Sequence, residues 1–241
     1  MIARRALVTG GSGGIGSAIC RRLARSGHHV YVHAHRSQAA TEALVQELQA
    51  AGAQAHTVHF DLTDAAATSA ALEAMLLAGP IQILVNNAAI HDDAAFPAMS
   101  APQWQRVIDV SLQGFFNVTR ALLLPMIRTR WGRIINISSV AALKGNRGQV
   151  NYAAAKGALN AATRALALEV ATRGITVNAV APGIITTRMT HSRFDAADIE
   201  RLVPMQRAGS SEEVASLVDF LSADAAAYIT GQVVSINGGM Y

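Results

Sequence analysis

The sequence predicts an α/β fold in which helices cover both faces of a single, doubly wound parallel sheet. Three observations lead to this fold class: short apolar runs alternate with longer amphipathic segments, a glycine-rich turn follows the first run, and 51% of the 241 residues are hydrophobic. Continuous apolar runs are typical of strands that are buried on both faces, as in a parallel sheet. A chain of this length can bury a substantial core within one domain, which we expect to span residues 1–241.

Six apolar runs are the predicted strands, and they cover residues 6–8, 29–32, 81–85, 134–137, 176–180 and 233–236. The segments between them carry apolar residues three or four positions apart, as helices that cover a sheet do. Such segments are residues 15–25, 38–51, 152–172 and 212–221. The repeated order of strand, helix and strand favours parallel pairing. Residues 188–210 form the longest stretch without a predicted element, and we expect them to act as a substrate lid.

The composition argues against several classes of partner. The formal charge is +4, but the arginines are spread along the whole chain, which is not the pattern of a nucleic-acid-binding tail. The sequence contains neither an unbroken run of about twenty apolar residues nor an apolar signal segment, so we expect no membrane association. The single cysteine, Cys20, cannot form an internal disulfide. We therefore expect a soluble, cytoplasmic protein, and we predict no metal site.

A glycine-rich motif stands between the first predicted strand and the first predicted helix. Its candidate ligand-binding residues are Gly10, Ser12, Gly14, Ile15 and Gly16. The glycines allow a ligand to approach the backbone closely, and the start of the helix offers N–H groups and a favourable dipole to a pyrophosphate. A flexible turn is the alternative interpretation. The strand before the motif and the helix after it favour a dinucleotide site in a Rossmann-type fold.

The turn after the second predicted strand indicates which dinucleotide is bound. An acidic side chain there would bind the ribose hydroxyls and repel a 2′-phosphate. The sequence instead reads His33-Ala34-His35-Arg36-Ser37. Arg36 is suited to clamp a 2′-phosphate, and Ser12 and Ser37 are further donors, so the sequence favours NADPH. A solvated surface arginine is the alternative interpretation of Arg36.

Asp61 and Leu62 follow the apolar run that ends at Phe60. This position is suited to contact with the adenine edge of a dinucleotide. A capping role for Asp61 in the turn 61–64 is an equally good interpretation.

Tyr152 and Lys156 are four residues apart and therefore share one face of a predicted helix. A free tyrosine has a pKa of about 10, so it is a poor catalyst near neutral pH unless a cation favours its phenolate. We expect Lys156 to supply that cation and to lower the pKa of Tyr152. An ordinary exposed pair on an alanine-rich helix is the alternative when the motif is taken alone.

Ser139 directly follows a predicted strand, at the carboxyl end where open α/β sheets bind ligands. We expect its hydroxyl to hold a substrate carbonyl oxygen. Ser138 is a competitor for this role, and a loop serine bonded to its own backbone is the alternative. A hydrolase nucleophile elbow has the pattern Gly-x-Ser-x-Gly. Ser139 is followed by Val140 and Ala141, so the sequence argues against a hydrolase.

In combination, these residues resemble the motifs of the short-chain dehydrogenase/reductase superfamily. The resemblance covers nearly the whole chain, through Thr9-Gly10-x-x-x-Gly14-Ile15-Gly16, Asn86-Asn87-Ala88-Ala89, Ser139, Tyr152-x-x-x-Lys156 and Pro182-Gly183-x-x-x-Thr187. Segments 151–157 and 227–241 are most similar to the β-ketoacyl-(acyl-carrier-protein) reductases of this superfamily. The resemblance implies NADPH-dependent reduction of a 3-oxoacyl thioester in fatty acid or related polyketide or polyene biosynthesis.

The resemblance also implies residue roles. The residues that it assigns to the coenzyme outside the glycine motif are Asn87, Ala88, Tyr152, Lys156, Pro182, Gly183, Ile185 and Thr187. Among these, Asn87 and Ala88 would line the adenosine ribose, and Ile185 with Thr187 would hold the carboxamide. Tyr152 would protonate the carbonyl oxygen while Ser139 stabilises its developing charge.

A carrier protein and other copies of the chain are the partners that the resemblance implies. Arg130 and Arg173 stand where carrier-dependent relatives use two arginines to meet the acidic helix of acyl carrier protein. A basic residue at the end of a helix is also explained by the helix dipole alone. Relatives are commonly tetramers, and we expect a homotetramer.

Three positions depart from the family pattern. Ser111 stands where the family usually has a catalytic asparagine that holds a water, and a serine offers fewer donors for that task. Gly13 replaces an arginine that many NADPH-dependent members have, which leaves Arg36 as the main phosphate clamp. Ala89 replaces the last glycine of the Asn-Asn-Ala-Gly motif.

Two rival functions remain open. The first is another oxidoreductase on the same scaffold, such as an alcohol, sugar or steroid dehydrogenase, and apolar residues of the predicted lid from Met189 to Met205 would decide it. The second is a catalytically silent dinucleotide-binding module, which only the Ser111 departure supports.

Overall fold

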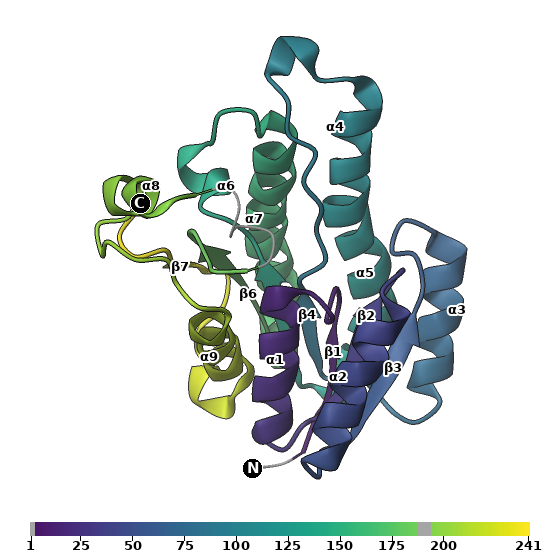
Figure 1. The fold of residues 1–241 in the computed structure, drawn as a ribbon. Helices are drawn as coiled ribbons and strands as arrows, with labels where there is room; N and C mark the ends of the chain where they lie inside the picture. The colour runs from purple at the N-terminus through teal and green to yellow at the C-terminus, as the bar shows by residue number, and fades with distance from the viewer. Residues whose placement is uncertain (1–2, 188–193) are drawn as a thin grey trace.

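The computed structural model of the protein describes residues 3–187 and 194–241. Within these residues the chain forms a seven-stranded parallel sheet with the order β3-β2-β1-β4-β5-β6-β7. Figure 1 shows helices on both faces of this sheet. The predicted fold class, a doubly wound α/β sheet of the Rossmann type, is confirmed.

The strands are β1 (Arg5–Val8), β2 (His29–Ala34), β3 (Ala55–His59), β4 (Ile83–Asn86), β5 (Gly132–Ile137), β6 (Ile175–Pro182) and β7 (Val233–Ile236). Six of them contain or overlap the predicted apolar runs. The strand that the apolar pattern missed is β3, the edge strand beside β2. It was missed because its sequence, Ala-His-Thr-Val-His, is largely polar and two of its five side chains are exposed.

The two faces of the sheet bury different sets of side chains, because consecutive residues of a strand point to opposite faces. Ala6 and Val8 of β1 join the core beneath α1, α2 and α9, whereas Leu7 joins the core beneath α3, α5 and α7. Both cores consist mostly of fully or nearly fully buried aliphatic residues. The sheet is therefore a rigid layer that is packed on both faces.

The helices are α1 (Gly14–Arg25), α2 (Gln38–Ala50), α3 (Ala65–Leu76), α4 (Ala101–Ile108), α5 (Gly114–Thr129), α6 (Ala141–Lys144), α7 (Val150–Val170), α8 (Ala196–Leu202) and α9 (Ser211–Ser222). The four predicted helical segments correspond to α1, α2, α7 and α9. Part of the predicted lid, residues 188–193, lies outside the described residues. The rest of the lid contains α8, which begins at an Asp195 cap.

Above the carboxyl edge of the sheet, α4 and the first turns of α7 stand side by side (Figure 1). A small third core joins them, in which Val107 of α4 packs with Tyr152 and Ala155 of α7. Between α4 and α5 the helix widens into a π-helical turn, Asp109–Gln113. Such insertions frequently occur at functional sites.

The continuous helical segment Ala101–Thr129 is long and apolar enough to cross a membrane by length and composition alone. The same test is met by helices of protein cores. In this structure Val118, Leu122 and Met126 are fully buried against the sheet. The apolar face of α5 is therefore used by the fold itself.

Candidate active site

The glycine motif forms a tight cradle at the end of β1. Gly10 has φ +62°, a conformation that side chains other than glycine rarely adopt. A Cβ atom on Gly16 would clash with the Gly10 carbonyl oxygen and would lie 2.8 Å from the Asn87 amide nitrogen. These two positions therefore require glycine, and the first turn of α1 lies directly against the loop.

The start of α1 is suited to an anionic group. Its N-cap residue, Gly13, has no side chain with which to cap the exposed N–H groups, and the first turn carries no acidic residue. Free N–H groups and the positive end of the helix dipole together bind phosphate. The described residues thus fit the pyrophosphate of a dinucleotide.

Thr9, Asn87 and Ala88 join the glycine cradle to the end of β4. The Thr9 hydroxyl accepts hydrogen bonds from the backbone N–H groups of Asn87 at 2.9 Å and Ala88 at 3.1 Å. The Asn87 side chain donates to the carbonyl oxygens of Thr9 and Gly10. The structure therefore brings these predicted coenzyme residues together at one edge of the sheet.

His33 is a structural residue of this cradle whose role the sequence analysis missed. Its Nδ1 accepts a hydrogen bond from the Gly10 N–H at 3.2 Å, and its Nε2 lies 3.0 Å from the Phe60 carbonyl oxygen. Burial lowers the pKa of His33 to about 4, so the ring is neutral at physiological pH and Nε2 carries its proton. The ring thereby ties the glycine cradle to the end of β3. A histidine at the end of the second strand was the only signal of this role in the sequence.

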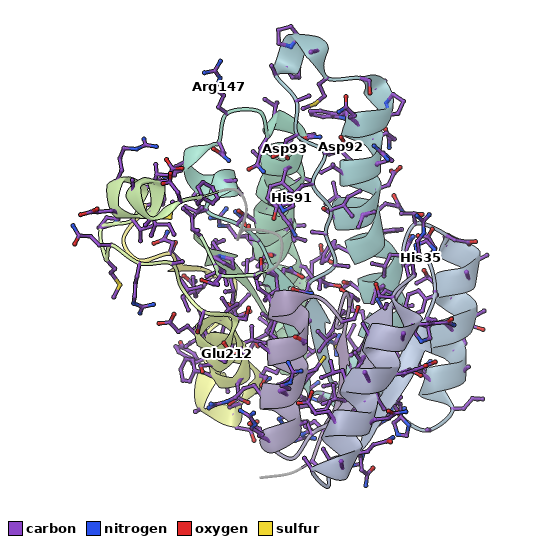
Figure 2. The ribbon with its side chains drawn as sticks, viewed as in Figure 1. His35, His91, Asp92, Asp93, Arg147 and Glu212 are labelled. Atoms are coloured by element: carbon purple, nitrogen blue, oxygen red, sulfur yellow. The ribbon has the colours of Figure 1, made fainter. Side chains whose placement is uncertain are left out.

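His35, Arg36 and Asp61 lie exposed or partly exposed just after β2 and β3 end. Figure 2 shows His35 beside α3, away from His91 and the aspartates that follow it. His35 Nδ1 lies 3.7 Å from a carboxylate oxygen of Asp61. Burial raises the pKa of Asp61, but hydrogen bonds from Thr63 and the charges of His35 and Arg36 outweigh it, and the pKa is lowered.

The cap of α3 is Asp64, whose carboxylate accepts from the N–H groups of Ala66 and Ala67. Asp61 instead accepts from Thr63 within the turn. The capping interpretation of Asp61 is therefore wrong, since the next aspartate performs that task. The Leu62 side chain is buried in the core beneath α3 and α5.

The segment after β6 returns to the glycine cradle. A Cβ atom on Gly183 would lie 2.8 Å from Asn237, and one on Gly14 would lie 3.0 Å from the Thr187 methyl group. Ile185 is buried and bridges to Gly209. The structure thus places Thr187 against Gly14, the first residue of α1, and Thr187 with Ile185 is the pair to which the family resemblance assigns the coenzyme carboxamide.

Ser139, Tyr152 and Lys156 meet between β5 and α7. The Ser139 and Tyr152 hydroxyls are hydrogen bonded to each other. Ser139 also accepts from the Ala141 N–H at 3.1 Å. The neighbouring Ser138 hydroxyl is buried and lies 3.5 Å from the Lys156 carbonyl oxygen, so it faces the helix backbone. Ser139 and not Ser138 is therefore the serine beside the phenol.

The pKa of Tyr152 shifts in the opposite direction from the one that the sequence predicted. Burial raises it to about 12, against a lowering by the hydrogen bond with Ser139, and the charge of Asp93 raises it further. Lys156 is itself buried, its Nζ donates to the Ile137 carbonyl oxygen at 2.7 Å, and it lies 5.8 Å from the centre of the tyrosine ring. Burial lowers the pKa of Lys156 to about 8. Desolvation is therefore the largest cause of both pKa shifts, and it favours the neutral form of each group.

Ser111 lies within the π-helical turn and is buried, and its hydroxyl has no hydrogen-bond partner among the described residues. It lines a cavity of about 10 Å³ together with Lys156, Leu159 and Asn86. This is about the room that one water molecule needs, and a buried hydroxyl is a suitable partner for it. The structure thus places Ser111, which stands where the family usually has an asparagine, at the same cavity as Lys156.

The loop after β4 adds polar residues that the sequence analysis did not single out. Figure 2 shows His91, Asp92 and Asp93 gathered between α4 and α7. The His91 ring packs on the Tyr152 ring with centroids 4.3 Å apart. The loop is anchored on both helices, because Asp92 pairs with Arg106 of α4 and its carbonyl accepts from Asn151 of α7 at 2.8 Å.

Arg130 and Arg173 lie together but far from Tyr152 along the sheet. Arg130 directly follows α5 and lies two residues before β5, and its guanidinium donates to the Thr172 carbonyl oxygen at 3.0 Å. Arg173 lies two residues before β6, and both arginine side chains are exposed. They therefore lie at the amino edge of the sheet, opposite the carboxyl edge that holds the catalytic residues.

Comparisons with known proteins agree with this geometry. A family model described as short chain dehydrogenase matches residues 4–198. The chain is 45% identical over 242 residues to an acetoacetyl-CoA reductase of Acinetobacter sp., and the match covers 98% of this chain and 97% of that protein. It is 43% identical over 236 residues to a 3-oxoacyl-(acyl-carrier-protein) reductase of Aggregatibacter actinomycetemcomitans, with coverage of 97% and 98%. A protein of the same activity from Synechocystis sp. is 44% identical over 242 residues, with coverage of 100% and 98%.

Proposed function

The chain belongs to the short chain dehydrogenase family and is an oxidoreductase, and we propose that it uses NADPH to reduce 3-oxoacyl thioesters to 3-hydroxyacyl thioesters. The observation that carries this proposal is the meeting of the Ser139 and Tyr152 hydroxyls beside Lys156, at the sheet edge that also holds the glycine cradle. The relatives reduce 3-oxoacyl groups on a carrier protein or on coenzyme A, according to their names.

When bound, the coenzyme supplies the hydride that reduces the carbonyl carbon. Tyr152 supplies the proton for the carbonyl oxygen. Because burial raises its pKa to about 12, the phenol is protonated at neutral pH, as a proton donor must be. The Ser139 hydroxyl, which is bonded to the same phenol, donates a second hydrogen bond to that oxygen and stabilises its developing charge.

A buried donor must be reprotonated after each turnover. Lys156 is one turn further along α7, and its pKa of about 8 is close enough to neutral pH for proton exchange. The cavity between Lys156 and Ser111 has room for one water molecule. In our proposal the Ser111 hydroxyl holds that water, in place of the asparagine that the family usually has.

The preference for NADPH rests on the residues at the ends of β2 and β3. Arg36 and His35 are exposed there, and the turn has no acidic residue. Asp61 is held by Thr63 and pairs weakly with His35, at the end of the next strand. This arrangement attracts a 2′-phosphate to Arg36, which is a suitable bidentate partner for it.

A direct test is to measure the oxidation of NADPH and of NADH with a 3-oxoacyl thioester at neutral pH, for the native chain and for Arg36→Ala. We expect faster turnover with NADPH, and an increase of about tenfold or more in its KM in the variant, because hydrogen bonds to a charged group are lost. The KM for NADH should not change. Equal turnover with both coenzymes would contradict the preference for NADPH. The absence of turnover with the thioester would contradict the proposal that 3-oxoacyl thioesters are the substrates.

The form in which the acyl group arrives is a second question. Acyl carrier protein is the proposed partner, with Arg130 and Arg173 as its docking residues. Because these arginines lie at the edge of the sheet opposite Tyr152, a carrier docked there must deliver its acyl group to the active site of another copy. Exposed apolar residues on α5 and α7, Leu124 and Leu168, are suited to contacts between copies, and we propose a cytoplasmic homotetramer.

The similarity to an acetoacetyl-CoA reductase supports coenzyme A thioesters as the competing substrates. The double variant Arg130→Glu/Arg173→Glu distinguishes a substrate bound to acyl carrier protein from one bound to coenzyme A. It should weaken kcat/KM for the carrier-bound substrate about tenfold or more and leave the free thioester unchanged, since paired charges across an interface control association. An equal rate with the carrier-bound substrate would remove the docking proposal, and sedimentation of a stable monomer would remove the tetramer.

A further inference from the structure

We propose that Asn151 is a positioning residue for the proton donor, because its side chain ties the backbone of Tyr152 to α4 and to the loop between β4 and α4. The inference rests on the proposed function, in which Tyr152 donates the proton. Asn151 itself is fully buried, so it acts on the reaction through Tyr152 and not on the substrate.

The start of α7 has no ordinary N-cap. The first N–H groups of a helix lack partners within it, and the residue before the helix usually supplies a side-chain acceptor. Gln149 has this place but makes no such bond, and its amide nitrogen donates to Asp93 at 3.0 Å. The Tyr152 N–H, which belongs to the first turn, instead donates to Asn151 Oδ1 at 2.7 Å. Asn151 thus caps the helix from within, on the backbone of the proton donor.

The nitrogen of the Asn151 amide reaches two neighbouring segments. It donates to the Asp92 carbonyl oxygen at 2.8 Å and to the Gln103 carbonyl oxygen at 3.3 Å. The orientation of the amide is fixed, because the two carbonyl oxygens only accept hydrogen bonds and the Tyr152 N–H only donates one. One buried side chain therefore connects the backbone of the proton donor to both α4 and the loop before it.

These two segments are held by bonds of their own. The Gln103 side chain donates to the Asp92 carboxylate at 2.9 Å and closes a capping box with Ser100 at the start of α4. Arg106 of α4 pairs with the same carboxylate. Asn151 thus ties the first turn of α7 to a support that does not depend on α7.

This connection bears on the reaction because the two catalytic hydroxyls come from different elements. Ser139 follows β5 and accepts from the Ala141 N–H, whereas Tyr152 is carried by α7. Their hydroxyls meet only while the first turn of α7 stays in place. A displacement of about 1 Å can cost about 10²-fold in rate. Loss of the Asn151 contacts should therefore misplace the phenol, although no reacting group is removed.

The test is a double-mutant cycle on the full chain, with the acetoacetyl thioester of N-acetylcysteamine as the substrate. Asn151→Ala removes all three hydrogen bonds. We expect its kcat to fall about ten- to a hundredfold, while the dissociation constant of NADPH stays within about twofold of the native value. In the Tyr152→Phe background the same substitution should change the residual kcat by less than about twofold, because no phenol is left to position.

Two further variants separate position from stability. Asn160→Ala is the matched control, since Asn160 is another buried asparagine of α7 that lies further along the helix, and its kcat should stay within about twofold of the native value. Asn151→Asp is the milder change, for use if the alanine variant does not fold. Burial keeps its carboxyl protonated, so it retains the acceptor for Tyr152 and one donor in place of two. Its kcat should fall about three- to tenfold, the size of one hydrogen bond.

The outcomes distinguish positioning from general damage. A fall by the same factor in both backgrounds would show that Asn151 does not act through Tyr152, and it would overturn the proposal. An unchanged kcat in Asn151→Ala, or an equal fall in Asn160→Ala, would overturn it too. A failure of the proposed function looks different, because it is seen while Asn151 is intact. The native chain would then not turn over the thioester, or Tyr152→Phe alone would keep a rate close to the native one.

Discussion

The glycine cradle at the end of β1 and the catalytic residues lie at the same edge of the sheet, but they are built differently. We call the second group the column; it consists of Ser139, Tyr152, Lys156, Ser111 and His91. The cradle is made of backbone: Gly10 adopts a positive φ, and Gly16 leaves room for the Gly10 carbonyl oxygen. The column is made of side chains from distant segments, in which Ser139, Tyr152 and His91 are brought together by three separate loops and helices.

This difference decides how each region tolerates change. In the cradle, any side chain at a required glycine collides with backbone, which cannot move without shifting α1. In the column, each residue contributes one hydrogen bond or one proton. A shorter side chain can still work there with the help of a bound water, as we propose for Ser111. Substitutions in the cradle should therefore destabilise the fold by steric clashes with the backbone and thereby weaken coenzyme binding, whereas each substitution in the column should slow one step of the chemistry.

The sharpest test of the cradle is Gly16→Ala compared with Gly13→Ala. A Cβ on Gly16 would clash with the Gly10 carbonyl oxygen, whereas one on Gly13 would lie 3.4 Å from the same oxygen, an ordinary contact. We expect Gly16→Ala to lower the free energy of unfolding by about 3 kcal/mol, as overpacking does, and to weaken coenzyme binding. Gly13→Ala should change neither property markedly. Equal effects in urea unfolding and in coenzyme titration would contradict the steric account.

In the column, the burial of Lys156 should be visible as a pH dependence of stability. Its pKa is about 8 in the folded chain, below the ordinary value of 10.5. Between these values the unfolded chain keeps a proton that the folded chain has lost, so stability rises with pH, by at most about 1.4 kcal/mol per pH unit. Urea unfolding at several pH values from about 8 to about 10 should show this rise in the native chain and not in Lys156→Met. Parallel curves for the two proteins would show that Lys156 is not desolvated.

A smaller effect is expected at Ser111. Removing its hydroxyl by Ser111→Ala should lower kcat about three- to tenfold, because the water in the adjoining cavity loses one hydrogen-bond partner. Coenzyme affinity should stay the same, since the residue lies in the π-helical turn and not in the cradle. Ser111→Thr, which keeps the hydroxyl, is the matched control. If kcat of the alanine variant equals the native value, the proton relay does not use Ser111.

The contrast between the two regions also governs what could be predicted from the sequence. The place of the cradle between β1 and α1 could be predicted, because a glycine-rich turn between a strand and a helix is a specific pattern, typical of a dinucleotide site. The buried strands were also predicted, but β3 was not, since an edge strand with polar residues such as His56 and His59 has no apolar run. Of the predicted lid, the structure describes residues 194–210, which contain α8.

The column was predicted less completely. Tyr152, Lys156 and Ser139 share a recognisable spacing, but the pKa of Tyr152 depends on burial, which no motif reports. The contact of His91 with Tyr152 joins residues that are far apart in the chain and depends on the loop anchored by Asp92. Neither the burial of Tyr152 nor its contact with His91 leaves a repeating pattern or a motif in the sequence, so both are seen only in the folded chain.

The central claim is that Tyr152 donates the proton in the reduction of a 3-oxoacyl thioester, and Tyr152→Phe tests it most directly. Coenzyme oxidation with the acetoacetyl thioester and coenzyme binding should be measured on the same native and variant samples. We predict that turnover falls by about 10²- to 10⁴-fold, the range for loss of a general acid, while the dissociation constant of NADPH stays within about twofold of the native value. Turnover by Tyr152→Phe at a rate close to the native one would contradict the account.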